Sequence, residues 1–139
     1  MTDPLITAYR AALYQVDLPG LRLELRVDTH CQALQRWLSM QGHACAALLT
    51  AHNPGSERCS NAQNDMAQQQ LQEEICARGL PFFTGRNVDR QGQWPQEESL
   101  LVPDLPLDAA HALARQFGQR AFLWCDDSGT PRLIQTRPA

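Results

Sequence analysis

The feature that most constrains the fold is a short apolar run in the middle of the chain. Residues 44–51 read Ala-Cys-Ala-Ala-Leu-Leu-Thr-Ala, and they lie between Gly42 and the pair Asn53-Pro54. The run shows no alternation of apolar and polar side chains, which is typical of a strand that is buried on both faces. It therefore predicts a strand in the interior of a sheet.

Other elements are indicated by capping residues, by breaks at glycine and proline, and by the spacing of apolar side chains. Residues 21–27 alternate leucine or valine with arginine or glutamate, so they predict a strand with one exposed face. Ser60 and Gln63 fit a capping box, and the glutamines at 68–70 are expected to form an exposed helix face. With capping residues included, helices are expected over 3 to about 15, 28–42, 60–79 and 108–118. Further strands are expected over 80–84, 99–102, 121–125 and 132–136.

This order of elements predicts a single domain over residues 1–139. Strand-helix-strand units favour parallel neighbours, whereas the turn at 126–129 predicts an antiparallel hairpin at the C-terminal end. We expect the α/β class, with α+β as the alternative. The expected architecture is one mixed β-sheet of about five or six strands with packed helices.

Composition excludes several classes of function. The formal net charge is −3, so the chain has no general attraction for nucleic acid. No apolar run approaches the ~20 residues that span a bilayer, and the first residues lack the features of a secretory signal. These observations predict a cytoplasmic protein without a membrane partner. All 12 residues in the Lys+Arg count are arginine, so the chain is lysine-free and mechanisms that need a lysine are excluded.

The five cysteines do not predict a metal or disulfide site. None forms a Cys-x-x-Cys pair, and an odd number spread along the chain does not suggest a disulfide framework. Histidines lie next to Cys31 and two residues from Cys45, a spacing that rarely supplies two ligands to one zinc ion. We expect free thiols, no metal and no cofactor. Cys59 is singled out because it precedes an expected helix start, where the pKa of a thiol is lowered.

Four segments carry a resemblance to a known family. They are Leu-Thr-Ala-His-Asn-Pro-Gly-Ser at 49–56, Asn61 with Asn64, Glu-Ser-Leu-Leu-Val at 98–102, and Phe-Gly-Gln-Arg-Ala-Phe at 117–122. From Tyr9 to Leu133 the chain resembles the small bacterial family catalogued as domain of unknown function 3293. The resemblance implies an uncharacterised bacterial protein and brings no activity with it. The positions that belong to the family motif are Thr50, Asn53, Pro54, Ser60, Asn64, Glu98, Ser99, Gly118 and Gln119.

The loop after the apolar run is the candidate site. In open α/β sheets, ligands gather at the carboxyl ends of the strands, and the connection at 52–59 is longer than the ~2–6 residues of a typical strand-to-helix loop. Pro54 is expected to hold Asn53 in an extended conformation, and the N–H groups at 61–63 would face a carbonyl or an anion. The candidate ligand-binding residues are His52, Asn53, Ser60, Asn64, Glu98 and Gln119. No catalytic residue is assigned.

Each of these residues also has a structural explanation, because Asn-Pro-Gly is a turn signal and capping accounts for Ser60. Two hypotheses for function follow. The first is a binding or interaction module for a small polar ligand or a protein partner, with Trp94 either as a contact or packed over a strand. The second is a hydrolase- or transferase-type enzyme that uses Glu98 or His52 as base and Asn53 to stabilise an anion. No sequence motif of a known catalytic class supports the enzyme, so binding is favoured.

Overall fold

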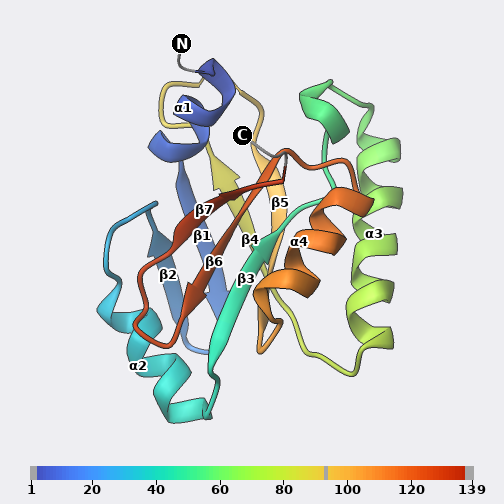
Figure 1. The fold of residues 1–139 in the computed structure, drawn as a ribbon. Helices are drawn as coiled ribbons and strands as arrows, with labels where there is room; N and C mark the ends of the chain where they lie inside the picture. Colours follow the sequence, from blue (N-terminus) through green and yellow to red (C-terminus); the bar gives the residue numbers. More distant parts are fainter. Residues whose placement is uncertain (1–2, 93, 137–139) are drawn as a thin grey trace.

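The computed structural model describes residues 3–92 and 94–136, and within them it shows four α-helices and seven strands (Figure 1). The helices are α1 (Pro4–Ala11), α2 (Gln32–Gln41), α3 (Asn61–Ala77) and α4 (Leu107–Gln116), with a short 3-10 helix, η1, at Pro54–Ser56. The strands are β1 (Leu13–Leu18), β2 (Leu21–Leu25), β3 (Cys45–Leu49), β4 (Phe83–Val88), β5 (Glu97–Pro103), β6 (Ala121–Asp126) and β7 (Arg132–Gln135). All seven strands form one sheet in the order β2-β1-β4-β5-β3-β6-β7.

Every pair of neighbouring strands in this sheet is antiparallel, so the fold is α+β and the expected parallel neighbours of a mixed sheet are wrong. The reason lies in the connections. Strands joined by α3 or α4 do run in the same direction, but another strand lies between them. β5 separates β3 from β4, and β3 separates β5 from β6. These two interlocked units form a split β-α-β arrangement of the ferredoxin-like kind over β3 to β6.

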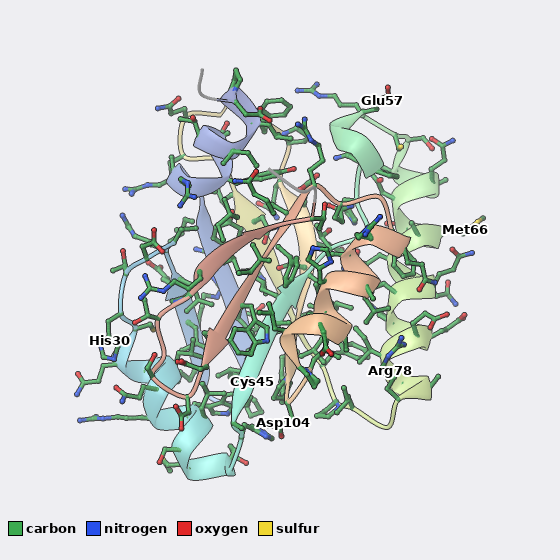
Figure 2. All side chains as sticks on the ribbon, in the orientation of Figure 1. His30, Cys45, Glu57, Met66, Arg78 and Asp104 are labelled. Atoms are coloured by element: carbon green, nitrogen blue, oxygen red, sulfur yellow. The ribbon has the colours of Figure 1, made fainter. Side chains whose placement is uncertain are left out.

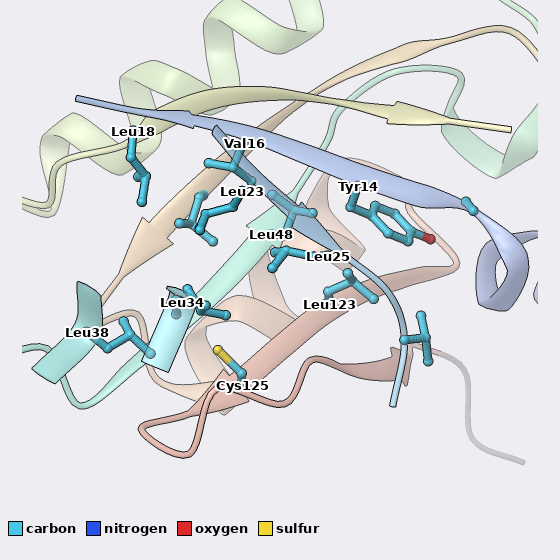
Figure 3. Close-up of a cluster of buried hydrophobic side chains, with 14 residues drawn as sticks. Tyr14, Val16, Leu18, Leu23, Leu25, Leu34, Leu38, Leu48, Leu123 and Cys125 are labelled. Carbon is cyan, nitrogen blue, oxygen red and sulfur yellow. The ribbon is translucent and has the colours of Figure 1, made fainter. Parts of the chain in front are cut away.

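Helices cover both faces of the sheet. α3 and α4 pack on one face, over an apolar cluster that includes the fully buried Leu71. α2 packs on the other face, where Leu34 lies among side chains of β1, β2, β3 and β6 (Figure 3). The sheet curls around this second face, and the backbone N–H of Asp28 donates to the carbonyl of Pro131 at 2.8 Å. We call the face covered by α2 the concave face.

Several expectations from the sequence are confirmed. β3 is buried at every position and lies inside the sheet between β5 and β6. The capping box of Ser60 and Gln63 is present at the start of α3, Gly42 ends α2 in a left-handed conformation, and β6 with β7 forms the C-terminal hairpin. Within the described residues, no helix has the length and apolar character that crossing a membrane requires.

The N-terminal part of the chain departs from expectation. α1 ends at Ala11, whereas the sequence predicted a helix to about Gln15. The residues that follow form β1, because Tyr14, Val16 and Leu18 alternate toward the core while the residues between them are partly exposed. The sheet therefore has seven strands, more than the five or six expected.

Other boundaries and one helix face also differ from expectation. α2 begins at Gln32 with Cys31 as its N-cap residue, whereas the sequence predicted a cap at Asp28 or Thr29; Asp28 has a left-handed φ of 62° that an N-cap does not use. α4 begins at Leu107, one residue before the expected cap, and β4 covers 83–88 instead of 80–84. Gln68, expected on an exposed helix face, is almost fully buried because it hydrogen-bonds the backbone beside β3.

Candidate functional site

The loop between β3 and α3 lies at one end of the sheet, and Asn53 holds it together. Its residue Glu57 lies at the opposite end of the molecule from Asp104 (Figure 2). The backbone N–H of Asn53 donates to Oδ1 of Asn64 at 2.9 Å. Its side-chain Oδ1 accepts from Nδ2 of Asn64 at 3.0 Å and from the backbone N–H of Cys59 at 2.9 Å. We call Asn53, Cys59 and Asn64 the Asn53 network.

This network explains a backbone conformation that the sequence did not predict. Asn53 has φ 49° and ψ 60°, which is left-handed, whereas an extended conformation was expected before Pro54. Asparagine visits this region more readily than most residues, and the hydrogen bonds at both its backbone and its side chain stabilise it there. The amide of Asn53 is therefore oriented by a tight turn of the chain.

A second contact connects the loop to the start of β6. Nε2 of Gln119 donates to the backbone carbonyl of His52 at 2.9 Å, and both residues are buried. The preceding Gly118 has φ 69°, and a Cβ at this position would lie 2.8 Å from Cβ of Pro54, so a side chain does not fit there. Four of the six candidate residues therefore meet in pairs, Asn53 with Asn64 and His52 with Gln119.

The ring of His52 is buried, and its Nε2 has no hydrogen-bond partner among the described residues. Burial lowers the pKa of His52, although the charges of Glu98 and Asp65 act in the opposite direction. The imidazole is therefore neutral at pH 7. A neutral imidazole with one unused nitrogen has the chemistry of a base, but it has no hydrogen-bonded partner here to orient it.

Ser60 and Glu98 lie outside these pairs. Oγ of Ser60 accepts from the backbone N–H of Gln63 at 3.1 Å, and the Gln63 side chain accepts from the backbone of Ser60 at 2.9 Å. The side chain of Glu98 is exposed, while its backbone carbonyl accepts from Oγ1 of Thr50 at 2.6 Å. Ser60 thus caps the start of α3, and Glu98 contributes its backbone carbonyl but, among the described residues, no side-chain hydrogen bond to the loop.

An acid that the sequence did not single out lies on the concave face. Glu97 is the cross-strand neighbour of Asn87, and Asn87 is the neighbour of Tyr14, so the three side chains form a row across β5, β4 and β1. Nδ2 of Asn53 donates to Oε2 of Glu97 at 2.8 Å, which connects this row to the Asn53 network. Because successive side chains on a strand point to opposite faces, Glu98 faces away from this row.

Alternation along β5 is the sequence signal that could have identified Glu97. Leu101 belongs to the cluster on the concave face and Leu100 to the cluster under α3 and α4. Counting back from Leu101 in steps of two places Ser99 and Glu97 on the concave face. The sequence predicted a strand that begins at Ser99, so neither glutamate was included in that count.

A small pocket lies beside Glu97, between α1, the loop of the Asn53 network and the turn that follows β4. Its volume is about 50 Å³. One buried water needs ~10–15 Å³, so the pocket has room for a group of a few atoms but not for a whole metabolite. We call it the Glu97 pocket. Besides Glu97 it is lined by Asn53, Arg58, Asn87, Asp89 and Trp94, and by Leu5, Ala8, Tyr9 and Ala12 of the N-terminal segment, with Val88 and Pro95.

The pocket contains hydrogen-bond acceptors that the described residues leave unused. Oδ1 of Asn87 is buried without a partner, and Glu97 accepts only from Asn53 and joins no ion pair in the described part of the chain. Burial raises the pKa of Glu97, and the hydrogen bond from Asn53 acts in the opposite direction. Burial also raises the pKa of Tyr14, whose hydroxyl donates to the carbonyl of Tyr9 at 2.7 Å.

Residues 49–122, which include this loop and most of the pocket, match the family model described as Protein of unknown function (DUF3293). The match covers more than half of the chain. The chain belongs to this family. The family resemblance seen in the sequence is thereby confirmed, over residues 49–122 of the range from Tyr9 to Leu133 in which it was seen. A search of curated proteins and a search of solved structures returned no match.

The DUF3293 match includes the residues at the junction of the loop and the sheet. Asn53, Asn64, Asn87 and Glu97 all lie within it, whereas α1, which forms the apolar wall of the pocket, precedes it. The matched segment therefore contains the Asn53 network together with the acid and the amide of the Glu97 pocket. Across residues 3–92 and 94–136, no group of three or more His, Cys, Asp or Glu side chains is arranged to hold a metal ion.

Proposed function

We propose that this DUF3293 protein is a binding module whose Glu97 pocket receives the polar end of a small ligand or of a partner's side chain. The observation that carries the proposal is the half-buried carboxyl of Glu97, which is held by one neutral amide and by no cation of the described chain. Burying a charged group is costly unless it is paired. A ligand that hydrogen-bonds this carboxyl would supply the missing partner.

The exposure of Trp94 also supports a binding role. Trp94 lines the pocket and keeps 39% of its surface exposed, although a large apolar side chain of this kind is usually covered. Exposed aromatic side chains are frequent anchors in binding sites because they bury a large area with few rotatable bonds. The polar end of a ligand would enter beside Glu97, and its remaining part would contact the indole.

The alternative, a hydrolase or transferase that uses Glu98 or His52 with Asn53, has weaker support. The side chain of Asn53 is engaged by the scaffold at both its oxygen and its nitrogen, so it is poorly placed to stabilise a developing anion. Glu98 forms no hydrogen bond with His52 in the described part of the chain. Binding is therefore the function that the geometry supports best.

The proposed setting is the cytoplasm of a bacterium, with no nucleic acid, membrane, metal or cofactor as partner. All five cysteines are free, which is the expected state in a reducing compartment. The net charge of −3 gives no field that would attract a phosphate backbone.

A thermal-shift screen with matched variants tests the proposal. Wild type, Glu97→Gln and Glu98→Gln are screened against nucleotides, amino acids, amines and sugar phosphates, because a ligand that binds only the native state raises the Tm. We expect at least one ligand whose shift is lost in Glu97→Gln and retained in Glu98→Gln, which removes the same charge from the opposite face. A ligand whose shift is the same in all three proteins would contradict binding at Glu97. A ligand that is converted to product would favour the enzyme.

A further inference from the structure

The Glu97 pocket has polar groups in its lining that form no hydrogen bond with the described residues. They are the second carboxyl oxygen of Glu97 and the side-chain amide of Asn87, whose Oδ1 is buried. Of the charged residues that line it, Glu97 and Asp89 are acidic and Arg58 is basic, an excess of one negative charge. A ligand that complements this lining donates hydrogen bonds and carries a positive charge.

The size and the walls of the pocket further restrict the kind of ligand that fits. A volume of about 50 Å³ accommodates a compact charged group with a short stem. The wall from the N-terminal segment is apolar at Leu5, Ala8 and Ala12, which suits methylene groups. Trp94 also lines the pocket, and an indole ring can attract a cation through its π face.

We propose that the Glu97 pocket binds a primary alkylammonium group, which donates to the free carboxyl oxygen of Glu97 beside the amide of Asn87. The alkyl stem lies along the apolar wall of α1 and passes Trp94. This assignment rests on the binding role proposed above and adds the chemical class of the ligand. The chain has no lysine, so none of its own side chains supplies an alkylammonium group, and the proposed source is a free amine or the lysine side chain of a partner.

Other small groups fit the lining less well. A carboxylate or a phosphate would be repelled by Glu97, which forms no ion pair with the described residues. An alcohol could donate one hydrogen bond but would leave the charge of Glu97 uncompensated. An ammonium has three donors and carries the positive charge that would pair with Glu97.

The indole signal of Trp94 provides a direct measurement. The chain has three tryptophans, and in a ¹H–¹⁵N spectrum the other two indoles act as internal controls. Trp124 donates its indole N–H to the carbonyl of Leu105 at 3.0 Å. Trp37 packs against Phe83 on the concave face, and neither Trp37 nor Trp124 lines the Glu97 pocket. The probe is n-butylamine at neutral pH, where it is protonated. The comparison probes are n-butanol, butyrate and propionamide.

We expect n-butylamine to shift the Trp94 signal in a saturable way and to leave the other two indoles in place. Glu97→Gln is expected to weaken binding about tenfold or more, equivalent to ~1.4 kcal/mol, while Glu98→Gln binds like wild type. Asn87→Leu, which removes the amide beside Glu97 in the lining, is expected to weaken binding severalfold. Unchanged signals of the other two indoles would show that Glu97→Gln keeps the fold. If that variant does not keep the fold, Asn87→Leu provides the test instead.

Each contrary result has a distinct meaning. If butyrate or propionamide shifts Trp94 and n-butylamine does not, the pocket binds ligands but the ammonium assignment is wrong. If n-butylamine binds wild type and Glu97→Gln equally, the assignment is also wrong. If none of the probes shifts Trp94 at about 50 mM, where even very weak sites fill, the ammonium proposal fails. A parallel titration with Nα-acetyl-lysine methylamide separates the two sources, because tighter binding than n-butylamine indicates a partner's lysine and weaker binding a free amine.

Discussion

Two polar clusters meet at the hydrogen bond between Asn53 and Glu97, and they are built in opposite ways. In the Asn53 network, the amide oxygen of Asn53 accepts twice, and Asn64 both donates and accepts. In the Glu97 pocket, a half-buried carboxyl has one donor, and the neighbouring Oδ1 of Asn87 has none among the described residues. The first cluster is closed by its own side chains, whereas the second still has acceptors to offer.

This difference separates scaffold from site. A buried polar group whose partners are all present stabilises the conformation that brings them together, and losing one partner exposes the desolvation cost of the others. A buried acceptor without a partner costs the folded state its desolvation free energy, and a bound ligand that donates to it would offset that cost. Changes in the Asn53 network should therefore reduce stability, and changes in the Glu97 pocket should reduce binding at little cost to stability.

Asn53→Ala is expected to have the largest effect on stability. It removes the acceptor of Cys59 and Asn64 and the donor to Glu97, and it places alanine at a φ of 49°. We expect the free energy of unfolding to fall by about 3 kcal/mol in urea titrations. Asn53→Gly loses the same side chain without the backbone strain, so it should be about 1 kcal/mol less damaging. Equal losses in the two variants would show that the left-handed turn carries no strain.

Gln68→Leu tests the scaffold on the other side of the loop. Oε1 of Gln68 accepts from the backbone N–H of Ala51 at 2.9 Å, and its Nε2 donates to the carbonyl of Glu98 at 3.3 Å. Leucine has a similar size but leaves both backbone groups unpaired, so we expect a loss of about 2 kcal/mol in the free energy of unfolding. The neighbouring Gln69→Leu, at an exposed position of α3, is the matched control and should change stability by less than about 0.5 kcal/mol. Similar losses in both variants would contradict a special role for Gln68.

The scaffold was more predictable from the sequence than the site. The apolar run of β3, the capping box at Ser60 and the glycine after α2 are local signals, and each is decided by residues within a few positions. Strand order, in contrast, depends on contacts between distant parts of the chain. The strand-helix-strand patterns predicted parallel neighbours, but in the sheet β5 lies between β3 and β4, and β3 lies between β5 and β6. The run of three glutamines at 68–70 did not indicate that Gln68 is buried and hydrogen-bonded to the backbone after β3.

For the site, the sequence located the loop and missed the pocket. Asn53, Asn64, His52 and Gln119 were identified because they flank a turn signal or belong to the family motif. Glu97 was missed by one position, since Glu98 carries the motif while strand alternation points Glu97 toward Asn53. The apolar wall from α1 is distant in the sequence, and only the folded chain brings it to Glu97.

Glu97→Gln is expected to change the free energy of unfolding only slightly, and the direction of that change is informative. Because burial raises the pKa of Glu97 in the folded state, the ionised carboxyl disfavours folding at neutral pH, and the native state binds the proton first as pH falls. We therefore expect Glu97→Gln to be slightly more stable than wild type at pH 7. The difference should shrink as pH decreases toward the unfolded-state value of about 4.3. Urea titrations across this range measure it, and a Glu97→Gln protein that is less stable at pH 7 would place Glu97 in the scaffold.

Asp104→Asn provides the opposite case at the far end of the molecule, with the smallest expected effect. Burial alone would raise the pKa of Asp104, but the backbone N–H of Ala44 at 2.8 Å and the ring of His43 at 2.6 Å lower it overall. Its stabilising contribution is present above the unfolded-state pKa of about 3.9 and is lost as pH falls through the lower folded-state value. Asparagine tolerates the left-handed φ of 62° at this position, so the backbone is preserved.

We expect Asp104→Asn to lower the free energy of unfolding by about 0.5 kcal/mol at pH 7, because 42% of the side chain is exposed and solvent screens the pair. The two carboxyl variants should therefore deviate from wild type in opposite directions at neutral pH, and both deviations should shrink in acid. Asp104 has its partners within the chain, so neutralising it removes stabilisation. Glu97 lacks a cation, so neutralising it removes a cost, and this contrast is lost if both variants are destabilised at pH 7.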